Sequence, residues 1–444
     1  MTTRVNDMPS GRRSARRTLA TAAALIALCW LTTGCGLLGS GNDTMSVVWD
    51  TPADRKAEPH GMGAWLSGDT LVRSRFDAVT GFDAATGERS WEYVPPGRSS
   101  VCHATADTAR SVLVLVRDRD GAASGVKDKS CTTAVGIDMK DGRELWQAPL
   151  SEPEPPRFQD YSVSAGAGVA VLLQQDELRA VDVRTGKPRW KAALPKGCVP
   201  GRTAAAERQV AAFLACGGED NLWEEKVAED AELHTAAFDP ATGALRWSAP
   251  LGGRRAIGYD AFASFVSAYP VVVAASESGD GERGSYFSFG RDGRPNPPID
   301  FSGPYGKIGY HSLTMAAADD RRLYAMPEPP TKRSRDSRYH LTAFDLATGA
   351  PVWGGTPEDD RLDGDSGYRL LVQDGTLTVL TSHRKNPSRV RVLDPATGEQ
   401  REIRDLPDDV DSVDKIFAYK GRLVVARYAA YETGSRPFTA YERR

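Results

Sequence analysis

The sequence has 444 residues and nearly balanced charge, with 56 Lys and Arg against 59 Asp and Glu and a formal net charge of -3. Proteins that bind nucleic acid usually present a basic surface, so this composition argues against a nucleic-acid partner. After residue 35 no apolar segment is long enough to cross a bilayer, which argues against a membrane-spanning protein.

The first residues of the chain have the pattern of an export signal. Four arginines between residues 12 and 17 precede an apolar stretch over residues 18–33, which is too short to span a bilayer comfortably. Cys35 follows, and the sequence around it resembles a bacterial lipobox. We therefore expect a lipoprotein signal peptide over residues 1–34, a lipid on Cys35 and a flexible tether over residues 35–44. An ordinary secretory signal is the alternative, and the choice between general secretory and twin-arginine export stays open.

From residue 45 to residue 444 one phrase recurs: a small residue, any residue, Asp, three residues, Gly, three residues and Trp. Its five complete copies are Gly81, Asp83, Gly87 and Trp91; Gly136, Asp138, Gly142 and Trp146; Ala180, Asp182, Gly186 and Trp190; Ala237, Asp239, Gly243 and Trp247; and Ala343, Asp345, Gly349 and Trp353. A period of roughly 50 residues is typical of propellers and other repeat architectures.

Each part of the phrase has a physical interpretation. Short β-branched and apolar runs separated by turn residues, as in residues 162–191, indicate antiparallel strands. The Asp carboxylate can accept hydrogen bonds from the following turn, and Gly supplies the positive φ that a tight turn needs. The Trp on the next strand can bury a flat surface against a neighbouring unit. Packing is the favoured role; a site that stacks a carbohydrate or a quinone on these indoles is the alternative.

Three weaker copies complete the pattern. Asp394 and Gly398 are followed by Glu402 where Trp is expected, and residues 286–293 keep only the Gly. The eighth copy is split, because residues 440–442 match its start and Trp49 matches its end. We therefore predict an all-β fold: an eight-bladed β-propeller of four-stranded antiparallel blades, closed by an N-terminal strand over residues 46–50.

Four cysteines remain after Cys29 and Cys35 are set aside: Cys102, Cys131, Cys198 and Cys216. An even number in an exported protein predicts two disulfides. Cys198 and Cys216 bracket one apolar strand, and Cys102 and Cys131 fall within one blade, so we expect the pairs Cys102–Cys131 and Cys198–Cys216. No pair has the spacing of zinc ligands, so we assign no metal site.

The repeat resembles the tryptophan-docking repeat of pyrroloquinoline-quinone-type propellers. That superfamily includes quinoprotein alcohol dehydrogenases and the propeller lipoprotein of the outer-membrane β-barrel assembly machine. The dehydrogenases have a disulfide between two adjacent cysteines beside the quinone, but here Cys102 is followed by His103. Two acidic stretches, residues 217–234 and 358–365, are interpreted as solvated loops. We assign no catalytic residue and no cofactor.

The sequence thus favours a non-catalytic binding or scaffold propeller, monomeric and held by its lipid at the extracytoplasmic face of the cell membrane. Its expected partner is an envelope protein or polymer that the sequence does not identify. A quinone-dependent or sugar-acting enzyme and an outer-membrane protein assembly factor are the two alternatives.

Overall fold

The chain divides into two units, residues 1–42 and Asp43–Arg444. The computed structural model describes residues 43–54, 63–118, 131–150, 163–174, 176–217, 232–251, 262–276, 283–309, 315–328, 340–354, 367–382, 387–408, 410, 412–428 and 436–444. The predicted signal peptide, Cys35 and most of the predicted tether lie outside these residues. The first strand begins at Asp43, two residues before the predicted start of the propeller.

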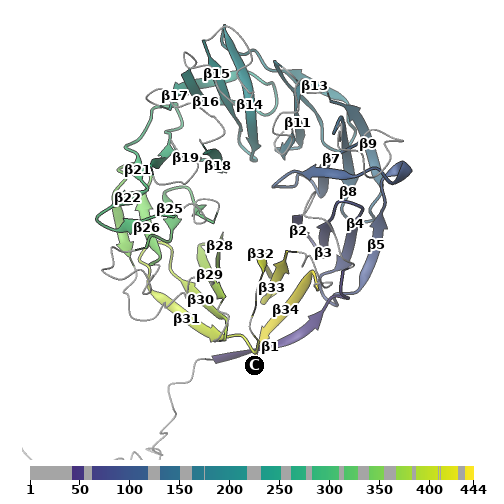
Figure 1. Cartoon of the computed structure of the whole chain (residues 1–444), viewed down its shortest axis with the longest axis vertical. Coiled ribbons are helices and arrows are strands. Elements are labelled where there is room, and N and C mark those ends of the chain that lie inside the picture. The colour runs from purple at the N-terminus through teal and green to yellow at the C-terminus, as the bar shows by residue number, and fades with distance from the viewer. Residues whose placement is uncertain are drawn as a thin grey trace, which may run out of the picture. The chain divides into compact units, whose positions relative to one another are not determined.

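The second unit is an all-β propeller of eight blades, as the repeat predicts. Six blades are separate four-stranded antiparallel sheets, and the remaining two share one eight-stranded sheet. Figure 1 shows the blades in a ring, with β2, β14, β18, β28 and β32 toward its centre and β5, β9 and β13 on its outside. From blade 3 around to blade 1 the first strands of neighbouring blades contact one another, including β28 with β32 and β32 with β2, and one buried cluster joins blades 1 and 2 and another joins blades 2 and 3, so the ring is closed.

Blades 1 to 4 follow one another along the chain. Blade 1 contains β2 (Gly63–Ser67), β3 (Thr70–Ser74), β4 (Val79–Asp83) and β5 (Arg89–Tyr93), and a short 3₁₀ helix, η1 (Pro96–Arg98), follows it. Blade 2 contains β6 (Val101–Ala104), β7 (Val112–Arg117), β8 (Thr133–Asp138) and β9 (Glu144–Pro149). Blade 3 contains β10 (Val163–Gly166), β11 (Val169–Gln174), β12 (Glu177–Asp182) and β13 (Pro188–Lys191). Blade 4 contains β14 (Cys198–Ala205), β15 (Val210–Cys216), β16 (Glu232–Phe238) and β17 (Leu245–Pro250).

Blades 5 to 8 complete the ring. Blade 5 contains β18 (Phe262–Ala268), β19 (Val271–Ser276), β20 (Gly284–Ser288) and β21 (Ile299–Asp300), followed by the small hairpin β22 (Ser302–Gly303) and β23 (Gly306–Lys307). Blade 6 contains β24 (Ala317–Ala318), β25 (Arg322–Ala325), β26 (Thr342–Asp345) and β27 (Pro351–Gly354). Blade 7 contains β28 (Gly367–Gln373), β29 (Thr376–Ser382), β30 (Arg389–Leu393) and β31 (Gln400–Asp405). Blade 8 contains β32 (Val413–Tyr419), β33 (Arg422–Arg427), β34 (Phe438–Arg443) and β1 (Asp43–Asp50).

The hydrophobic core is divided among the joints between blades. The described residues form eight buried apolar clusters, and each cluster combines side chains of two adjacent blades. Strand β7 shows the cause: Val112, Val114 and Val116 face blade 3, whereas Leu113 and Leu115 face blade 1. Because successive side chains of a strand point to opposite faces, a middle strand covered on both sides is apolar throughout.

The N-terminal strand closes the ring as predicted. Strand β1 pairs antiparallel with β34, placing Val47 opposite Tyr441 and Trp49 opposite Ala440. Its first residues also pair in parallel with β31 of blade 7. The Trp49 side chain is 9% exposed and belongs to the cluster between blades 8 and 1. The strand thus protects an edge that would otherwise present unpaired backbone groups.

Replacement of Trp49 tests this closure. Trp49→Ala should lower the melting temperature by the equivalent of about 3–5 kcal/mol, because it removes a buried indole from the closing joint. Val47 lies on the same strand and is 39% exposed, so Val47→Ala is the matched control; it should change stability by less than about 0.5 kcal/mol. Thermal unfolding followed by circular dichroism measures both variants. Equal melting temperatures would contradict closure through Trp49.

Candidate functional site

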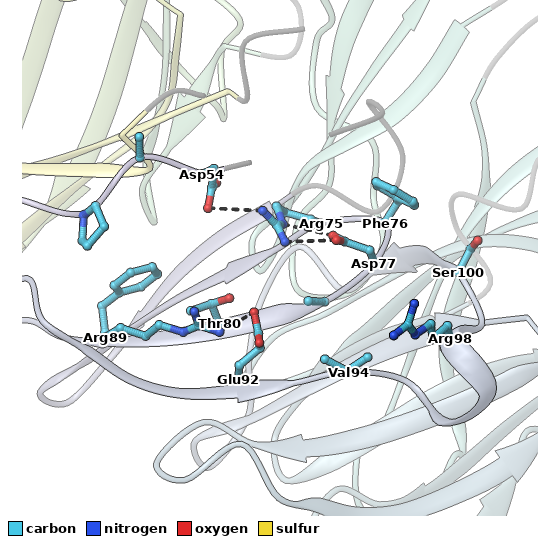
Figure 2. Close-up of a pocket in the computed structure, with 14 residues that line it drawn as sticks. Asp54, Arg75, Phe76, Asp77, Thr80, Arg89, Glu92, Val94, Arg98 and Ser100 are labelled. Carbon is cyan, nitrogen blue, oxygen red and sulfur yellow. Dashed lines mark hydrogen bonds and ion pairs between the residues drawn. The ribbon is translucent and has the colours of Figure 1, made fainter. Parts of the chain in front are cut away.

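A cavity of about 450 Å³ lies where the chain passes from β1 into blade 1. The residues after β1 and the strands of blade 1 form its walls, and Figure 2 shows its polar groups. Arg75 is buried and paired with two carboxylates. Its Nη1 lies 3.6 Å from Asp54 Oδ1, and its Nε lies 3.1 Å from Asp77 Oδ1. The Nε of Arg73, also buried, lies 3.7 Å from Asp54 Oδ2.

The charges in this cavity compensate one another. Burial raises the pKa of Asp54, and the charges of Arg73 and Arg75 oppose that rise. Because Arg75 contacts both carboxylates, Asp54 and Asp77 are held in an ionic cluster and are not arranged as a nucleophile with its base. The cluster ties the segment after the closing strand to blade 1. Sequence reasoning missed it, since these residues lie outside the repeat phrase.

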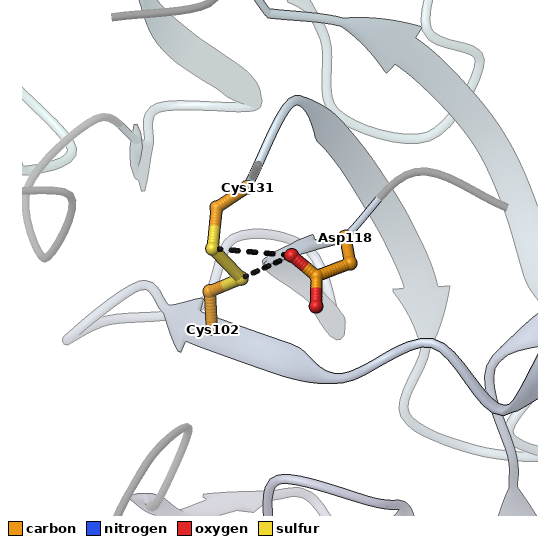
Figure 3. Close-up of side chains that lie close together, drawn as sticks. All are labelled: Cys102, Asp118 and Cys131. Atoms are coloured by element: carbon orange, nitrogen blue, oxygen red, sulfur yellow. Dashed lines mark hydrogen bonds between the residues drawn. A yellow bond between two sulfur atoms is a disulfide. The ribbon is translucent and has the colours of Figure 1, made fainter. Parts of the chain in front are cut away.

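Both predicted disulfide pairings are present in the structure, Cys102–Cys131 in blade 2 and Cys198–Cys216 in blade 4. Cys198 and Cys216 lie directly opposite each other on β14 and β15. Figure 3 shows Asp118 beside the first disulfide, with Oδ1 3.8 Å from the Cys102 sulfur and 3.7 Å from the Cys131 sulfur.

Among the described residues, one group of side chains is close enough together to be considered as metal ligands: Cys102, Asp118 and Cys131. The sulfurs of Cys102 and Cys131 are joined in a disulfide. A disulfide sulfur carries neither a proton nor the thiolate charge that binds zinc. The arrangement is therefore a partly buried disulfide beside a buried carboxylate.

The tryptophans of the repeat dock on the next blade. Each indole lies against the turn glycine of the neighbour, so closely that a Cβ on that glycine would fall within 2.4–2.7 Å of the indole side chain. The docked pairs are Trp49 on Gly87, Trp91 on Gly142, Trp146 on Gly186, Trp190 on Gly243, Trp247 on Gly293 and Trp353 on Gly398. The glycines also have positive φ, 72° at Gly142. Glycine is thus required twice at this position, by the turn and by the ring above it.

Most docked indoles also form a hydrogen bond to the neighbouring blade. The Nε1 of Trp146 donates to the carbonyl of Val183 at 2.7 Å, and the Nε1 of Trp190 donates to the carbonyl of Pro240 at 2.8 Å. In each case the acceptor is the residue immediately after the repeat Asp. Trp49 and Trp247 have no such partner among the described residues.

The repeat Asp organises the turn, as its position in the phrase suggests. The Oδ1 of Asp182 accepts hydrogen bonds from the backbone amide and the hydroxyl of Thr185, both at 2.9 Å. Its Oδ2 accepts from Arg189 at 2.6 Å. The bond from Arg189 is the largest cause that lowers the pKa of Asp182 to about 2. The carboxylate is thereby held in its charged form.

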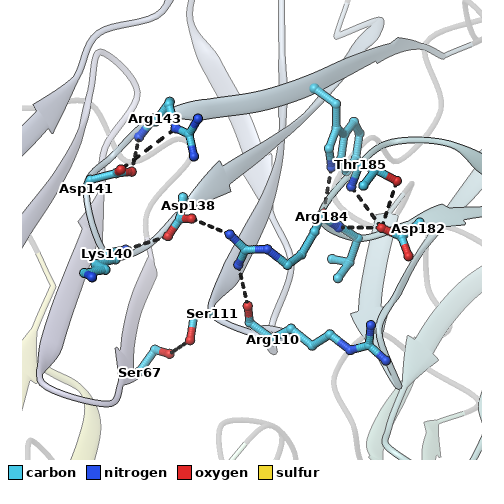
Figure 4. Close-up of polar contacts among 12 residues, drawn as sticks. Ser67, Arg110, Ser111, Asp138, Lys140, Asp141, Arg143, Asp182, Arg184 and Thr185 are labelled. Atoms are coloured by element: carbon cyan, nitrogen blue, oxygen red, sulfur yellow. Dashed lines mark hydrogen bonds and ion pairs between the residues drawn. The ribbon is translucent and has the colours of Figure 1, made fainter.

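Figure 4 shows how the turns of blades 2 and 3 are linked. Arg184 of blade 3 donates to Asp138 Oδ2 at 2.6 Å and to the carbonyl of Arg110 at 3.1 Å. Burial opposes ionisation of Asp138, but the amide of Lys140 and the Arg184 guanidinium outweigh it and lower its pKa. The repeat residues that the sequence singles out are therefore brought together at the blade joints, where they connect one blade to the next.

Two blades lack the docking tryptophan. In blade 7, Glu402 pairs with Val392 across the sheet and forms an ion pair with Arg404. In blade 5, the residue four positions after Gly293 is Pro297, and its carbonyl oxygen lies against Gly349 of blade 6. The sequence shows Pro297 four residues after Gly293, where the repeat has Trp. The spacing of the repeat does not show that the carbonyl oxygen of this proline lies against Gly349.

The two acidic stretches lie partly or wholly outside the described residues. Of the stretch at residues 217–234, the described part includes Glu232, which begins strand β16 and does not belong to a loop. Residues 358–365 lie outside the described part. Among the described residues, no helix combines the length and the apolar character that crossing a bilayer requires.

The ring and its docked indoles define this protein as an eight-bladed propeller of the tryptophan-docking type. Residues 40–214 match the family model described as outer membrane protein assembly factor BamB. The chain thus carries a β-propeller repeat of the BamB type over β1, blades 1 to 3 and the first two strands of blade 4. Among curated protein sequences, none matches this chain.

Similar solved structures come from several functional classes. BamB from Moraxella catarrhalis is 14% identical over 90% of this chain and 98% of that chain, with a TM-score of 0.49. Quinohemoprotein alcohol dehydrogenase from Comamonas testosteroni is 12% identical over 90% and 76%, with a TM-score of 0.51. A eukaryotic initiation factor is 10% identical over 89% and 90%, also with a TM-score of 0.51. At these sequence identities the last two structures show that the fold is shared, and their functions are not assigned to this chain.

Asp182 makes the pH dependence of stability testable. Its pKa is lowered in the folded state, so its stabilising effect is present above the ordinary pKa near 3.8 and is lost as pH falls toward about 2. The stability of the Asp182→Asn variant should therefore fall less between pH 5 and pH 2 than that of the unmodified protein. This pH window spans the ordinary pKa near 3.8 and the folded-state pKa of about 2. Melting temperatures measured across that range report the difference.

Asp176, exposed in the hairpin between β11 and β12 of the same blade, provides the control. Asp176→Asn should keep the pH dependence of the unmodified protein. If Asp182→Asn does the same, the carboxylate does not stabilise the folded turn in the way its contacts indicate.

Proposed function

We propose that this protein is an exported, lipid-anchored propeller that acts as a non-catalytic binding or scaffold module at the extracytoplasmic face of the cell membrane. The observation that carries the proposal is the BamB-type repeat over residues 40–214, whose family is described as an outer membrane protein assembly factor. In this proposal residues 1–34 are the signal peptide, Cys35 carries the lipid, and residues 35–44 are the tether, whose last two residues belong to β1. The partner is an envelope protein or polymer.

The rigidity of the ring supports a scaffold role. Six indoles are docked on neighbouring glycines, and eight apolar clusters fill the joints, so the ring can hold surface groups in fixed positions. A preformed surface loses little conformational entropy when a partner binds. A mildly acidic chain with both charge signs on its surface also suits a protein partner better than nucleic acid.

The residues do not fit the quinone chemistry of the dehydrogenases that share this fold. The resemblance implies a disulfide between adjacent cysteines beside the quinone, whereas here the two disulfides span 29 and 18 residues in different blades. All four described cysteines are used in these bonds. These residues therefore give no support to the enzyme alternative.

An outer-membrane assembly role is the second candidate. The description of the matched family favours it. Cross-linking of the membrane-bound protein in cells, followed by identification of the linked proteins, separates the two. Linkage to a β-barrel assembly complex would select the second candidate.

Lipid anchoring is tested at Cys35. The unmodified protein should fractionate with the membrane, because two or three acyl chains give stable anchoring. Cys35→Ala should shift it to the extracytoplasmic soluble fraction or leave it unprocessed, and Cys29→Ala is the matched control that should stay anchored. Mass spectrometry of the mature N-terminus checks the modification directly. A mature protein with an unmodified Cys35 would disprove the anchor.

The absence of quinone catalysis is tested by titration. Pyrroloquinoline quinone added with calcium to the purified protein should show no saturable binding by calorimetry, and no oxidation of alcohols or sugars with a dye acceptor. A quinoprotein alcohol dehydrogenase serves as the positive control. Stoichiometric quinone binding with dye reduction would overturn the non-catalytic assignment.

A further inference from the structure

The cavity where β1 leads into blade 1 has a second set of polar groups, outside its ionic cluster. Val94, Arg98 and Ser100 belong to the segment between β5 and β6 and lie along one side of the cavity (Figure 2). Thr80 of β4 also lines it. Strand β5 is the outer strand of blade 1 and lies on the outside of the ring (Figure 1), so a partner beside the ring can reach this part of the cavity.

Two hydroxyl groups of this lining have no hydrogen bond. Thr80 is 7% exposed and Ser100 is 8% exposed. Neither side-chain oxygen has a hydrogen-bond partner among the residues that the structure describes. Neither belongs to the fully buried polar atoms without a partner, so both oxygens are open to the cavity that they line. A nearly buried hydroxyl without a partner is unfavourable, and a ligand that accepts its hydrogen bond is therefore favoured.

The lining also contains an arginine whose charge is not paired. The arginine and the two carboxylates of the ionic cluster contact one another, and Asp54 is shared with the buried Arg73. Arg89 forms an ion pair with Glu92. Within the described part of the chain, the Arg98 guanidinium forms neither an ion pair nor a hydrogen bond. Its charge is therefore available to an anion that enters the cavity.

The backbone holds Arg98 in an unfavourable conformation. The residue ends a short turn that begins at Pro95, where the Arg98 amide donates to the Pro95 carbonyl at 3.0 Å. Its φ is 56°, in the left-handed region that a residue with a Cβ rarely adopts. A glycine at this position would adopt the same conformation without strain. Strain of this kind is often retained at binding sites, and here it belongs to the residue with the unpaired charge.

The chemistry of these groups fits a carboxylate. A guanidinium presents two parallel N–H donors to the two oxygens of a carboxylate, and the two hydroxyls supply further donors. The carboxylates of Asp77 and Glu92 line the same cavity, so a singly charged anion is favoured over a doubly charged phosphate. Val94 is 50% exposed in the same lining and offers an apolar surface next to the charge.

We propose that this side of the cavity binds the carboxylate of an Asp or Glu side chain on an extended segment of a partner protein. The carboxylate pairs with Arg98 and accepts hydrogen bonds from the hydroxyls of Ser100 and Thr80, while an apolar neighbour on the segment packs against Val94. This site rests on the proposed function, because it gives the binding module a position and a chemistry for its partner.

The test titrates the purified protein with the peptide N-acetyl-Val-Glu-Val-amide and follows valine methyl resonances by NMR. The Val94 resonances, assigned with Val94→Ala, should shift and saturate. Those of Val352, which is 48% exposed on β27 of blade 6, should not shift. The peptide with Gln in place of Glu should bind at least about tenfold more weakly, because it lacks the charge. The phosphoserine peptide and sodium acetate should also bind more weakly than the Glu peptide.

Variants of the lining locate the bound carboxylate. Arg98→Gln should weaken binding by at least about tenfold, and Ser100→Ala by about threefold. Lys196 is an exposed cation in the corresponding segment between β13 and β14, so Lys196→Gln is the matched control and should change the affinity by less than about twofold. Arg98→Gly should abolish measurable binding and yet raise the melting temperature by about 1–2 °C, because glycine relieves the strain.

Several results would overturn the proposal. They are an absent or unsaturable Val94 shift, equal affinity for the Glu and Gln peptides, unchanged binding in Arg98→Gln, and tighter binding of phosphoserine peptide or acetate. A lower melting temperature in Arg98→Gly would show instead that this side chain supports the fold. Stronger binding in Glu58→Gln, in the segment 55–62 outside the described residues, would show that the chain's own carboxylate takes the site. Membrane anchoring through Cys35 and the cross-linked partners would persist in each case, so the proposed function fails separately.

Discussion

The contact of an indole with a glycine of the next blade is the interaction on which the structure depends. At Gly142 a Cβ would lie 2.4 Å from the Trp91 ring, and the backbone has a φ of 72°, so glycine is required both by the turn and by the ring above it. The Trp91 Nε1 then donates to the carbonyl of Met139 at 3.1 Å in the same turn. One residue thus fixes the distance and the orientation between two blades, and repetition of that contact builds a ring.

Closure of the ring determines that blade 7 has no docked tryptophan. Strand β1 provides the outer strand of blade 8 and carries Trp49 onto Gly87 of blade 1, so that joint is complete. In blade 8 strand β34 pairs with β1 from the opposite part of the sequence, and no Asp-to-Gly turn connects these two strands. An indole at position 402 of blade 7 would have no turn glycine to dock on. Glu402 instead pairs with Arg404 at the surface of the shared sheet.

The fold was predictable because its information is local. The spacing of Asp, Gly and Trp within one unit specifies a strand, a turn and a strand, and the split copy at Trp49 is sufficient to indicate the closing strand. The sequence places Cys198 and Cys216 on either side of one strand; in the structure they lie opposite each other on two consecutive strands, β14 and β15, and the predicted pairing holds because these strands form one hairpin. Contacts between blades are different, because Trp91 and its acceptor Met139 are 48 residues apart. The ionic cluster of Asp54, Arg73 and Arg75 has no repeat to reveal it, and its position could not be predicted.

The two blades without a docking tryptophan, blades 5 and 7, lack it for different reasons. Topology explains the absence of tryptophan at position 402, because blade 8 has no Asp-to-Gly turn on which an indole of blade 7 could dock. Pro297 has no such reason, because Gly349 of blade 6 is present with a φ of 69° and the Asp345 turn is intact. The carbonyl oxygens of Pro297 and Pro298 lie against Gly349 instead, in the place that a docked indole takes at other joints. The Ser288 hydroxyl donates to the carbonyl of Leu346, the acceptor position that an indole N–H uses at other joints, so this joint is connected by groups that the repeat phrase does not contain.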